Sequence, residues 1–270
     1  MTLLTERLGE GPLVVSMPHS GLKLSPGLEQ RLTPSALALP DTDWHIPELY
    51  DFLAPFNATI IAAEYSRYVI DLNRDPSGQS LYPGQATTGL VAMERFDGEP
   101  IYRDGEAPDA AEIEARKRDY FEPYHAALEG ALERARSHHG YALLWDAHSI
   151  ASEVPRLFDG GLPDLNLGSN SGASCAPAVE AEAARVMQTS TEFSSVSNGR
   201  FKGGWITRHY GQPEAGVHAL QMEIGQNAYM GGAPAYAFNP AKAARLRPVL
   251  NSIISAALDA AAKFHAGASS

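Results

Sequence analysis

Cysteine is nearly absent from this chain, whose 270 residues include a single one, Cys175. One cysteine can form neither an internal disulfide nor a metal site built from thiolates, so a metal in this protein would be held by histidine and carboxylate side chains. A chain without disulfides also suits a reducing compartment. We therefore expect a cytoplasmic protein.

Long apolar runs and an excess of basic residues are also lacking. No apolar run approaches the roughly 18 residues of a membrane span, and residues 1–7 lack the basic start and apolar core of a signal peptide. Lysine and arginine number 21 against 32 aspartates and glutamates, which gives a formal net charge of -11. Binding to a phosphate backbone depends on clusters of basic residues. The sequence thus predicts a soluble, intracellular protein that binds neither nucleic acid nor a membrane, and it does not indicate the oligomeric state.

The composition, 44% hydrophobic and 20% charged, allows a substantial core. We find no internal repeat and no linker, so we expect a single α/β domain over residues 1–270. Helices are predicted over residues 43–53, 109–139 and 177–187 and from Asn239, the expected N-cap, to the end of the chain. Strands are predicted over residues 13–17, 58–63, 68–72, 143–149, 205–207 and 217–224. Pro123 should kink or split the long helix, and residues 73 to about 105 and 151–176 read as long, functional loops.

Polar side chains stand at the ends of several predicted strands. His19 follows the first strand, Asn73 and Arg74 follow residues 68–72, and Glu223 lies near the end of residues 217–224. His148, in the run that also holds Asp146, is the strongest candidate, although a lone histidine is often only structural. Open α/β sheets place their chemistry at the carboxyl ends of their strands, so we expect these groups to meet there.

Asp41 and Asp43 stand at the amino end of the helix predicted over residues 43–53, where capping needs only one acid. Two histidines and one aspartate would complete the three protein ligands of a catalytic zinc site and leave a position for water or substrate. A nearby carboxylate would then carry the water proton to a leaving amine, and Glu223 is our candidate; the alternative is an exposed glutamate at a strand end.

Arginines suit an anionic substrate because their planar guanidinium binds carboxylates through two hydrogen bonds. Arg67, Arg74 and Arg208 are the candidates, although any of them could instead pair with a structural acid. The partner expected from the sequence is therefore a small molecule that carries carboxylates.

Seven motifs resemble those of the N-formylglutamate amidohydrolases, and the resemblance spans about residues 13 to 235. The motifs are Pro18-His19-Ser20-Gly21, Asp41-Thr42-Asp43-Trp44, Asp71-Leu72-Asn73-Arg74-Asp75-Pro76, Leu81-Tyr82-Pro83-Gly84-Gln85, Trp145-Asp146-Ala147-His148-Ser149, Asn166-Leu167-Gly168 and the eleven residues 201–211. The resemblance implies metal-dependent hydrolysis of N-formyl-L-glutamate to formate and L-glutamate, a step of histidine degradation. It also implies a three-layer, phosphorylase/hydrolase-like α/β fold with a mixed central sheet flanked by helices, distantly similar to zinc carboxypeptidases and aspartoacylases.

The more distant likeness suggests the metal ligands. In the carboxypeptidase pattern a glutamate ligand follows the first histidine by three residues, but here Leu22 follows His19, so the acid must come from elsewhere. We expect one divalent ion, zinc, held by His19, Asp43 and His148, with Asp41 as the alternative acid. Asp146 could ligate the ion, orient His148 or cap a turn, and we favour the orienting role.

The likeness also suggests the other roles. Glu223 resembles the general base, and the pair Asn73-Arg74 resembles the pair that holds a substrate carboxylate. Arg208 and His209 lie in a motif peculiar to the family, so we expect them to contact substrate, with Arg67 as another anchor. Two alternatives stay open: a related deacylase for another N-acyl amino acid, and an inactive binding protein on the same scaffold.

Overall fold

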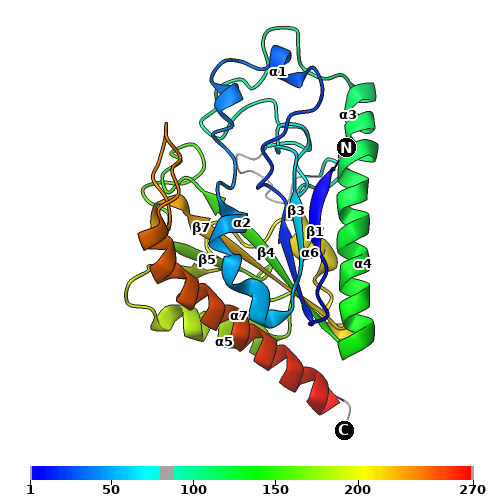
Figure 1. Cartoon of the computed structure of the whole chain (residues 1–270), viewed down its shortest axis with the longest axis vertical. Coiled ribbons are helices and arrows are strands. Elements are labelled where there is room, and N and C mark those ends of the chain that lie inside the picture. Colours follow the sequence, from blue (N-terminus) through cyan, green and yellow to red (C-terminus); the bar gives the residue numbers. More distant parts are fainter. Residues whose placement is uncertain (1, 80–87, 269–270) are drawn as a thin grey trace.

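The computed structural model describes residues 2–79 and 88–268. Its centre is a sheet with the strand order β1-β3-β2-β4-β7-β5-β6 (Figure 1). The strands are β1 (Leu4–Arg7), β2 (Leu13–Met17), β3 (Thr59–Ala63), β4 (Ala142–Ile150), β5 (Leu165–Gly168), β6 (Ser195–Ser197) and β7 (Val217–Gly225). The central strands β3, β2, β4 and β7 are mutually parallel, whereas β1 pairs antiparallel with β3 and β5 pairs antiparallel with β7. The expected mixed sheet of an α/β fold is confirmed.

Helices cover both faces of this sheet, which gives three layers (Figure 1). The longer helices are α3 (Ala110–Arg116), α4 (Glu122–His139), α5 (Pro177–Thr189) and α7 (Pro240–Ala268). The shorter ones are α1 (Leu28–Arg31), η1 (Ala36–Ala38), α2 (Ile46–Leu49), η2 (Asp51–Phe56), η3 (Lys117–Phe121), α6 (Trp205–Tyr210), η4 (Pro213–Ala215) and η5 (Gln226–Ala228). Among the described residues, none of these helices combines the length and the apolar character that a membrane crossing requires.

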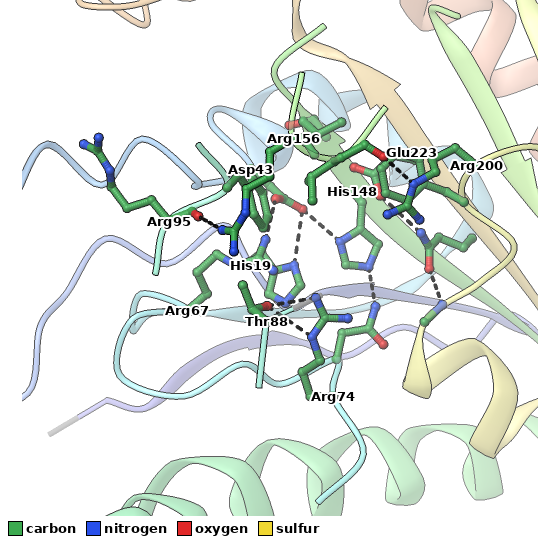
Figure 2. A pocket seen from close by; sticks show the side chains of 18 residues that line it. His19, Asp43, Arg67, Arg74, Thr88, Arg95, His148, Arg156, Arg200 and Glu223 are labelled. Carbon is green, nitrogen blue, oxygen red and sulfur yellow. Dashed lines mark hydrogen bonds and ion pairs between the residues drawn. The ribbon is translucent and has the colours of Figure 1, made fainter. Parts of the chain in front are cut away.

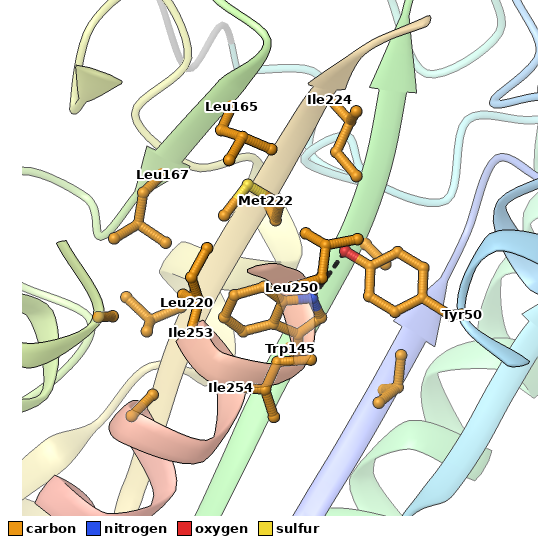
Figure 3. Close-up of a cluster of buried hydrophobic side chains, with 14 of the residues drawn as sticks. Tyr50, Trp145, Leu165, Leu167, Leu220, Met222, Ile224, Leu250, Ile253 and Ile254 are labelled. Carbon is orange, nitrogen blue, oxygen red and sulfur yellow. Dashed lines mark hydrogen bonds between the residues drawn. The ribbon is translucent and has the colours of Figure 1, made fainter. Parts of the chain in front are cut away.

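Alternate residues of the central strands supply the two halves of the core. Val15 and Trp145 face the helices α5 and α7, whereas Val14 and Leu144 face α4. This alternation follows from the pleat of a strand, and both sets are apolar because the parallel strands are covered on both sides. Trp145 is fully buried, and its indole N–H donates to the Tyr50 hydroxyl at 3.0 Å (Figure 3).

Most of the predicted elements are confirmed. Residues 13–17, 58–63, 143–149 and 217–224 fall on strands, and the Asn239 side chain accepts a hydrogen bond from the backbone N–H of Lys242 at 3.1 Å, as an N-cap does. Residues 43–53 form the short helix α2 and the start of η2. The long helix is not split at Pro123: a π-helical turn, η3, joins α3 to α4, and Pro123 lies in the first turn of α4, directly after this wider turn.

Two predicted strands are wrong. Residues 68–72 form turns and irregular backbone. Their apolar side chains are buried in the half of the core that α4 covers. The carbonyl of Val69 accepts a hydrogen bond from Arg116 at 2.9 Å, not from a neighbouring strand. Residues 205–207 begin the helix α6, although Ile206 and Thr207 are β-branched, because tertiary contacts override local propensity. The short strands β1, β5 and β6 were not predicted, and the motif Leu81-Tyr82-Pro83-Gly84-Gln85 lies outside the described residues.

Candidate active site

Three neighbouring parallel strands deliver the central side chains. His19 follows β2, His148 lies near the end of β4, and Glu223 lies near the end of β7, where it is the register partner of His148. The backbone N–H of Asp43 donates to the carbonyl of His19 at 3.1 Å, which brings this acid from its own segment to the same edge. Figure 2 shows the four side chains gathered in one cavity. The predicted meeting of polar groups at the carboxyl ends of the strands is observed.

His19, Asp43 and His148 form a buried group whose possible ligand atoms all lie within 4.8 Å of one another. The Asp43 carboxylate oxygen Oδ2 lies 2.9 Å from Nδ1 of His148 and 3.8 Å from Nδ1 of His19. Among the described residues this is the one such group of histidine, cysteine and acid side chains. Two imidazoles and one carboxylate are the donor set of many catalytic zinc sites.

A second carboxylate stands behind each histidine. Nε2 of His19 lies 2.7 Å from Asp71, and Nε2 of His148 lies 3.0 Å from Asp146 and 2.9 Å from the amide nitrogen of Asn73. The Nδ1 atoms of both histidines face Asp43 and are the nitrogens that could ligate an ion beside it. Histidines that ligate metals almost always donate their other nitrogen to such a partner. These residues therefore fit a divalent ion.

The two uncertain aspartates occupy distinct places. Asp41 accepts hydrogen bonds from the Tyr68 hydroxyl at 2.8 Å and from the backbone N–H of Phe96 at 3.0 Å, and it is not part of the buried group. Asp146 is fully buried and also accepts from Ser16 Oγ at 2.9 Å. The geometry favours Asp43 over Asp41 as the ligand and places Asp146 behind His148.

Glu223 is buried beside this group, and burial together with the nearby Asp43 carboxylate raises its pKa to about 8, although His148 and Arg67 oppose the rise. A bound cation would act in the opposite direction and favour the carboxylate. Asp71 is also buried, which by itself raises a carboxyl pKa, but His19 and the guanidinium groups of Arg67 and Arg74 hold its pKa well below the usual range. Asp71 thus remains charged behind His19.

The cavity has a volume of about 760 Å³, part of it open to solvent. Its lining comprises His19, Asp43, Arg67, Asn73, Arg74, Thr88, Arg95, Phe96, His148, Ser149, Ile150, Arg156, Leu157, Arg200, Phe201, Gly204, Gln221 and Glu223. Five of these residues are arginines, of which only Arg67 and Arg74 were predicted. Arginines thus outnumber the two acids, Asp43 and Glu223, in this lining.

The five arginines differ in their contacts. Arg67 is buried, donates to Asp71 at 2.7 Å and lies over the Phe96 ring, so its charge offsets the surrounding acids. Arg74 donates to Thr88 Oγ1 at 3.0 Å and lies 3.6 Å from Asp71. Figure 2 shows the Arg74 guanidinium among the central side chains.

The other three arginines come from loops. Arg95 forms a salt bridge with Asp97 at 2.6 Å, and Arg156 pairs with Glu94. Arg200 donates from Nε to the carbonyl of Leu157 at 2.8 Å. Sequence reasoning missed all three; their position in or next to the loops that follow strand ends was the available signal, since binding residues concentrate there.

Three predicted substrate contacts are placed differently. Arg208 and His209 do not line the cavity: Arg208 donates to the carbonyl of Gly203 at 2.9 Å, and His209 stacks on Trp205 with ring centroids 4.2 Å apart. Asn73 lines the cavity, but its amide nitrogen donates to Asp146 at 3.1 Å and its oxygen accepts from the backbone N–H of Ile206 at 2.7 Å. Asn73 thus supports His148 in this arrangement.

Known proteins resemble this chain over nearly its whole length. The chain is 49% identical to an N-formylglutamate deformylase of Pseudomonas aeruginosa over 256 residues, which cover 95% of this chain and 96% of that protein. It is 47% identical to an N-formylglutamate deformylase of Pseudomonas putida over the same shares.

Solved structures show the same architecture. The crystal structure of an N-formylglutamate amidohydrolase from Ralstonia eutropha matches with a TM-score of 0.78 and 26% identity, over 99% of this chain and 100% of that one. A protein of Agrobacterium tumefaciens shares the fold, with a TM-score of 0.72 and 16% identity over 96% of each chain. The family profile of the N-formylglutamate amidohydrolases matches residues 11–230. The chain therefore belongs to the N-formylglutamate amidohydrolase family.

Proposed function

We propose that this protein hydrolyses N-formyl-L-glutamate to formate and L-glutamate, with one divalent metal ion, zinc, held by His19, Asp43 and His148. The observation that carries the proposal is the buried histidine-aspartate-histidine group beside Glu223, in a cavity lined by arginines. The names of the two Pseudomonas relatives support the substrate. When bound, such an ion supplies Lewis-acid polarisation of the formyl carbonyl and a lowered pKa for water.

Glu223 performs the proton transfers. As a carboxylate it takes a proton from the attacking water, and as an acid it returns the proton to the amine that leaves as L-glutamate. Its place opposite His148 on the neighbouring strand puts it at the edge of the proposed metal site. The bond between the formyl carbon and nitrogen breaks, one bond from carbon to the water oxygen forms, and the products are formate and the free amino group.

Arg74 binds a substrate carboxylate and so orients the amide for attack. Its guanidinium lies close to Asp71, which supports His19, so it stands next to the reacting centre. Binding energy from a group that does not react can lower the barrier by several kcal/mol through orientation. The guanidinium of Arg67 donates to Asp71 and to the carbonyl of Asp41. Arg67 therefore adds positive potential to the site without binding the substrate carboxylate directly.

We also propose that this reaction is a step of histidine degradation, as the sequence resemblance implies, and that it takes place in the cytoplasm, since a chain with the one buried free thiol of Cys175 suits a reducing compartment. A substrate panel tests the activity. Formate or acetate release should be measured with N-formyl-L-glutamate, N-formyl-L-glutamine and N-acetyl-L-glutamate. The proposal predicts the highest kcat/KM for N-formyl-L-glutamate. A higher value for N-acetyl-L-glutamate would favour the alternative, a deacylase for another N-acyl amino acid.

A further inference from the structure

The motif of residues 201–211 supplies few side chains to the cavity, yet the start of α6 lies against the active site. Two of its backbone N–H groups point at amide side chains rather than into solvent. Gly204 donates to Oε1 of Gln221 at 2.7 Å, and Ile206 donates to Oδ1 of Asn73 at 2.7 Å. All four groups are buried or nearly so, and a buried N–H requires a partner.

These two bonds fix which way each amide points. Because the oxygen of Gln221 accepts from Gly204, its amino group must face the other way, and it donates to Oε2 of Glu223 at 3.2 Å. Gln221 and Glu223 are two residues apart on β7, so both side chains lie on the same face of the strand. The hydrogen bond therefore holds one oxygen of the proposed base (Figure 2).

The amide of Asn73 is held in the same way, beside His148 rather than beside Glu223. Its oxygen accepts from Ile206, so its amino group faces Asp146 and donates to Oδ2 at 3.1 Å. The same oxygen of Asp146 lies 3.0 Å from Nε2 of His148. The amino group of Asn73 also lies 2.9 Å from Nε2 of His148, so Asn73 contacts both His148 and Asp146.

The glycines of the motif permit this close approach. A Cβ atom at Gly204 would lie 2.5 Å from the amide nitrogen of Asn73, a distance that real Cβ contacts do not reach. Gly203 has a φ of +112°, in the region that favours glycine, and a Cβ there would meet the side chain of Thr207 at 2.9 Å. Only glycine at position 204 lets the chain lie this near to Asn73, and Gly203 permits the turn that precedes it.

We propose that the start of α6 acts as a backbone template and that Gln221 and Asn73 are positioning residues, one for the base Glu223 and one for His148. The proposal rests on the proposed function, since it takes Glu223 as the base. Small errors in the placement of catalytic groups are costly, and a misplacement of 1 Å can lower the rate by about 100-fold.

Gln221→Glu is the discriminating variant. It keeps an oxygen for the N–H of Gly204 and nearly the same shape, but it removes the donor to Glu223 and places a carboxyl oxygen in its stead. We expect kcat for N-formyl-L-glutamate to fall by about 10- to 100-fold while KM and the bound metal per chain change by less than about threefold. Gln212→Glu is the charge control, because Gln212 is exposed and its side chain donates to the carbonyl of His209, away from Gln221 and Glu223, and it should keep the wild-type kcat.

A kcat for Gln221→Glu within about twofold of the wild type, or a loss confined to KM, would overturn the role of Gln221. If the melting temperature shows that this variant does not fold, Gln221→Met, of similar volume, takes its place with the same expectations. A wild-type protein that releases no formate would overturn the proposed function, and this proposal with it, whereas an active wild type with an unimpaired Gln221→Glu variant refutes the positioning role alone.

Asn73→Asp supplies a readout that does not depend on turnover. It retains an acceptor for Ile206 but replaces the amino group that contacts Asp146 and His148 with a carboxylate oxygen, so the contacts that hold His148 change. We expect the affinity for Zn²⁺, measured by chelator competition, to fall by about 10- to 100-fold. An affinity equal to that of the wild type would contradict the role of Asn73.

Discussion

His148 and Glu223 are register partners on the adjacent parallel strands β4 and β7. One strand thus carries a proposed metal ligand and the next carries a proposed base, at the same level along the two strands. The distance between these two residues is fixed by the hydrogen bonds between β4 and β7 and not by a flexible loop. Sites built on strands hold catalytic groups more precisely than sites built on loops.

This relationship makes Glu223→Gln the first test of mechanism. The amide keeps the shape of the side chain but cannot take a proton, so turnover should fall by about 100- to 10,000-fold. The metal content should stay at the wild-type level, because Glu223 is not part of the group formed by His19, Asp43 and His148. Metal analysis and a formate assay on the same preparation measure both quantities. Undiminished turnover would remove Glu223 from the mechanism.

The Asp146→Asn variant distinguishes two roles of Asp146, which either orients His148 or ligates the ion itself. The carboxylate contacts His148, Ser16 and Asn73, and an asparagine cannot make all three contacts in the same way. A supporting role predicts a fall in Zn²⁺ affinity of about 10- to 100-fold, with one ion still bound at saturation. Competition with a chromophoric chelator gives the affinity. Loss of stoichiometric binding would indicate a ligand instead.

Arg74→Met tests the carboxylate anchor. A hydrogen bond to a charged group contributes about 1.5 to 3 kcal/mol, so KM for N-formyl-L-glutamate should rise by roughly 10- to 100-fold, with a smaller effect on kcat. Arg95→Met is the matched control, because Arg95 also lines the cavity but pairs with Asp97, and Figure 2 shows its guanidinium directed away from the central histidines. Equal KM values for the wild type and Arg74→Met would contradict the assignment.

Stability should decrease in acid because of His125. Burial lowers the pKa of this histidine from 6.5 to about 4, although its hydrogen bond to the Leu72 carbonyl opposes the shift. Above pH 6.5 the ring is neutral in both the folded and the unfolded chain. As the pH falls from there toward 4, only the unfolded chain takes up the proton, so the free energy of unfolding should fall by roughly 3 kcal/mol.

Urea unfolding at a series of pH values measures this effect. His125→Asn removes the titrating group, so its free energy of unfolding should depend less steeply on pH between about 6.5 and 4 than that of the wild type. His218, whose pKa burial also lowers to about 4, remains in both proteins and cancels in the comparison. Parallel curves for the two proteins would show that His125 does not titrate as described.

The sequence predicted the strands that carry the site because β2, β4 and β7 are covered on both faces. Such strands are continuous apolar runs, so the polar residues His19, His148 and Glu223 at their ends stand out. Residues 68–72 were misread for the same reason. They too are apolar and buried, but their burial comes from packing against the helices, and periodicity does not distinguish the two environments.

Other features depend on contacts between distant segments. The Asp41 carboxylate accepts hydrogen bonds from Tyr68 and from the backbone of Phe96, which are 27 and 55 residues away in the sequence. No local sequence pattern therefore distinguishes Asp41 from Asp43. The arginines Arg95, Arg156 and Arg200 come from irregular segments, where the direction of a side chain follows from tertiary contacts rather than from a period. Residues 201–211 resemble the family motif, but the contacts of Gly204 and Ile206 with Gln221 and Asn73 are made by backbone N–H groups, which a residue pattern does not show.

Metal removal and replacement tests the central claim most directly. Protein stripped with a chelator should release formate from N-formyl-L-glutamate at less than about 1% of the untreated rate, since removal of the ion takes away its polarisation of the carbonyl. Addition of Zn²⁺ should restore activity in a titration that saturates at one equivalent per chain. Full activity of protein shown to contain no metal, or saturation without any gain of activity, would contradict the account.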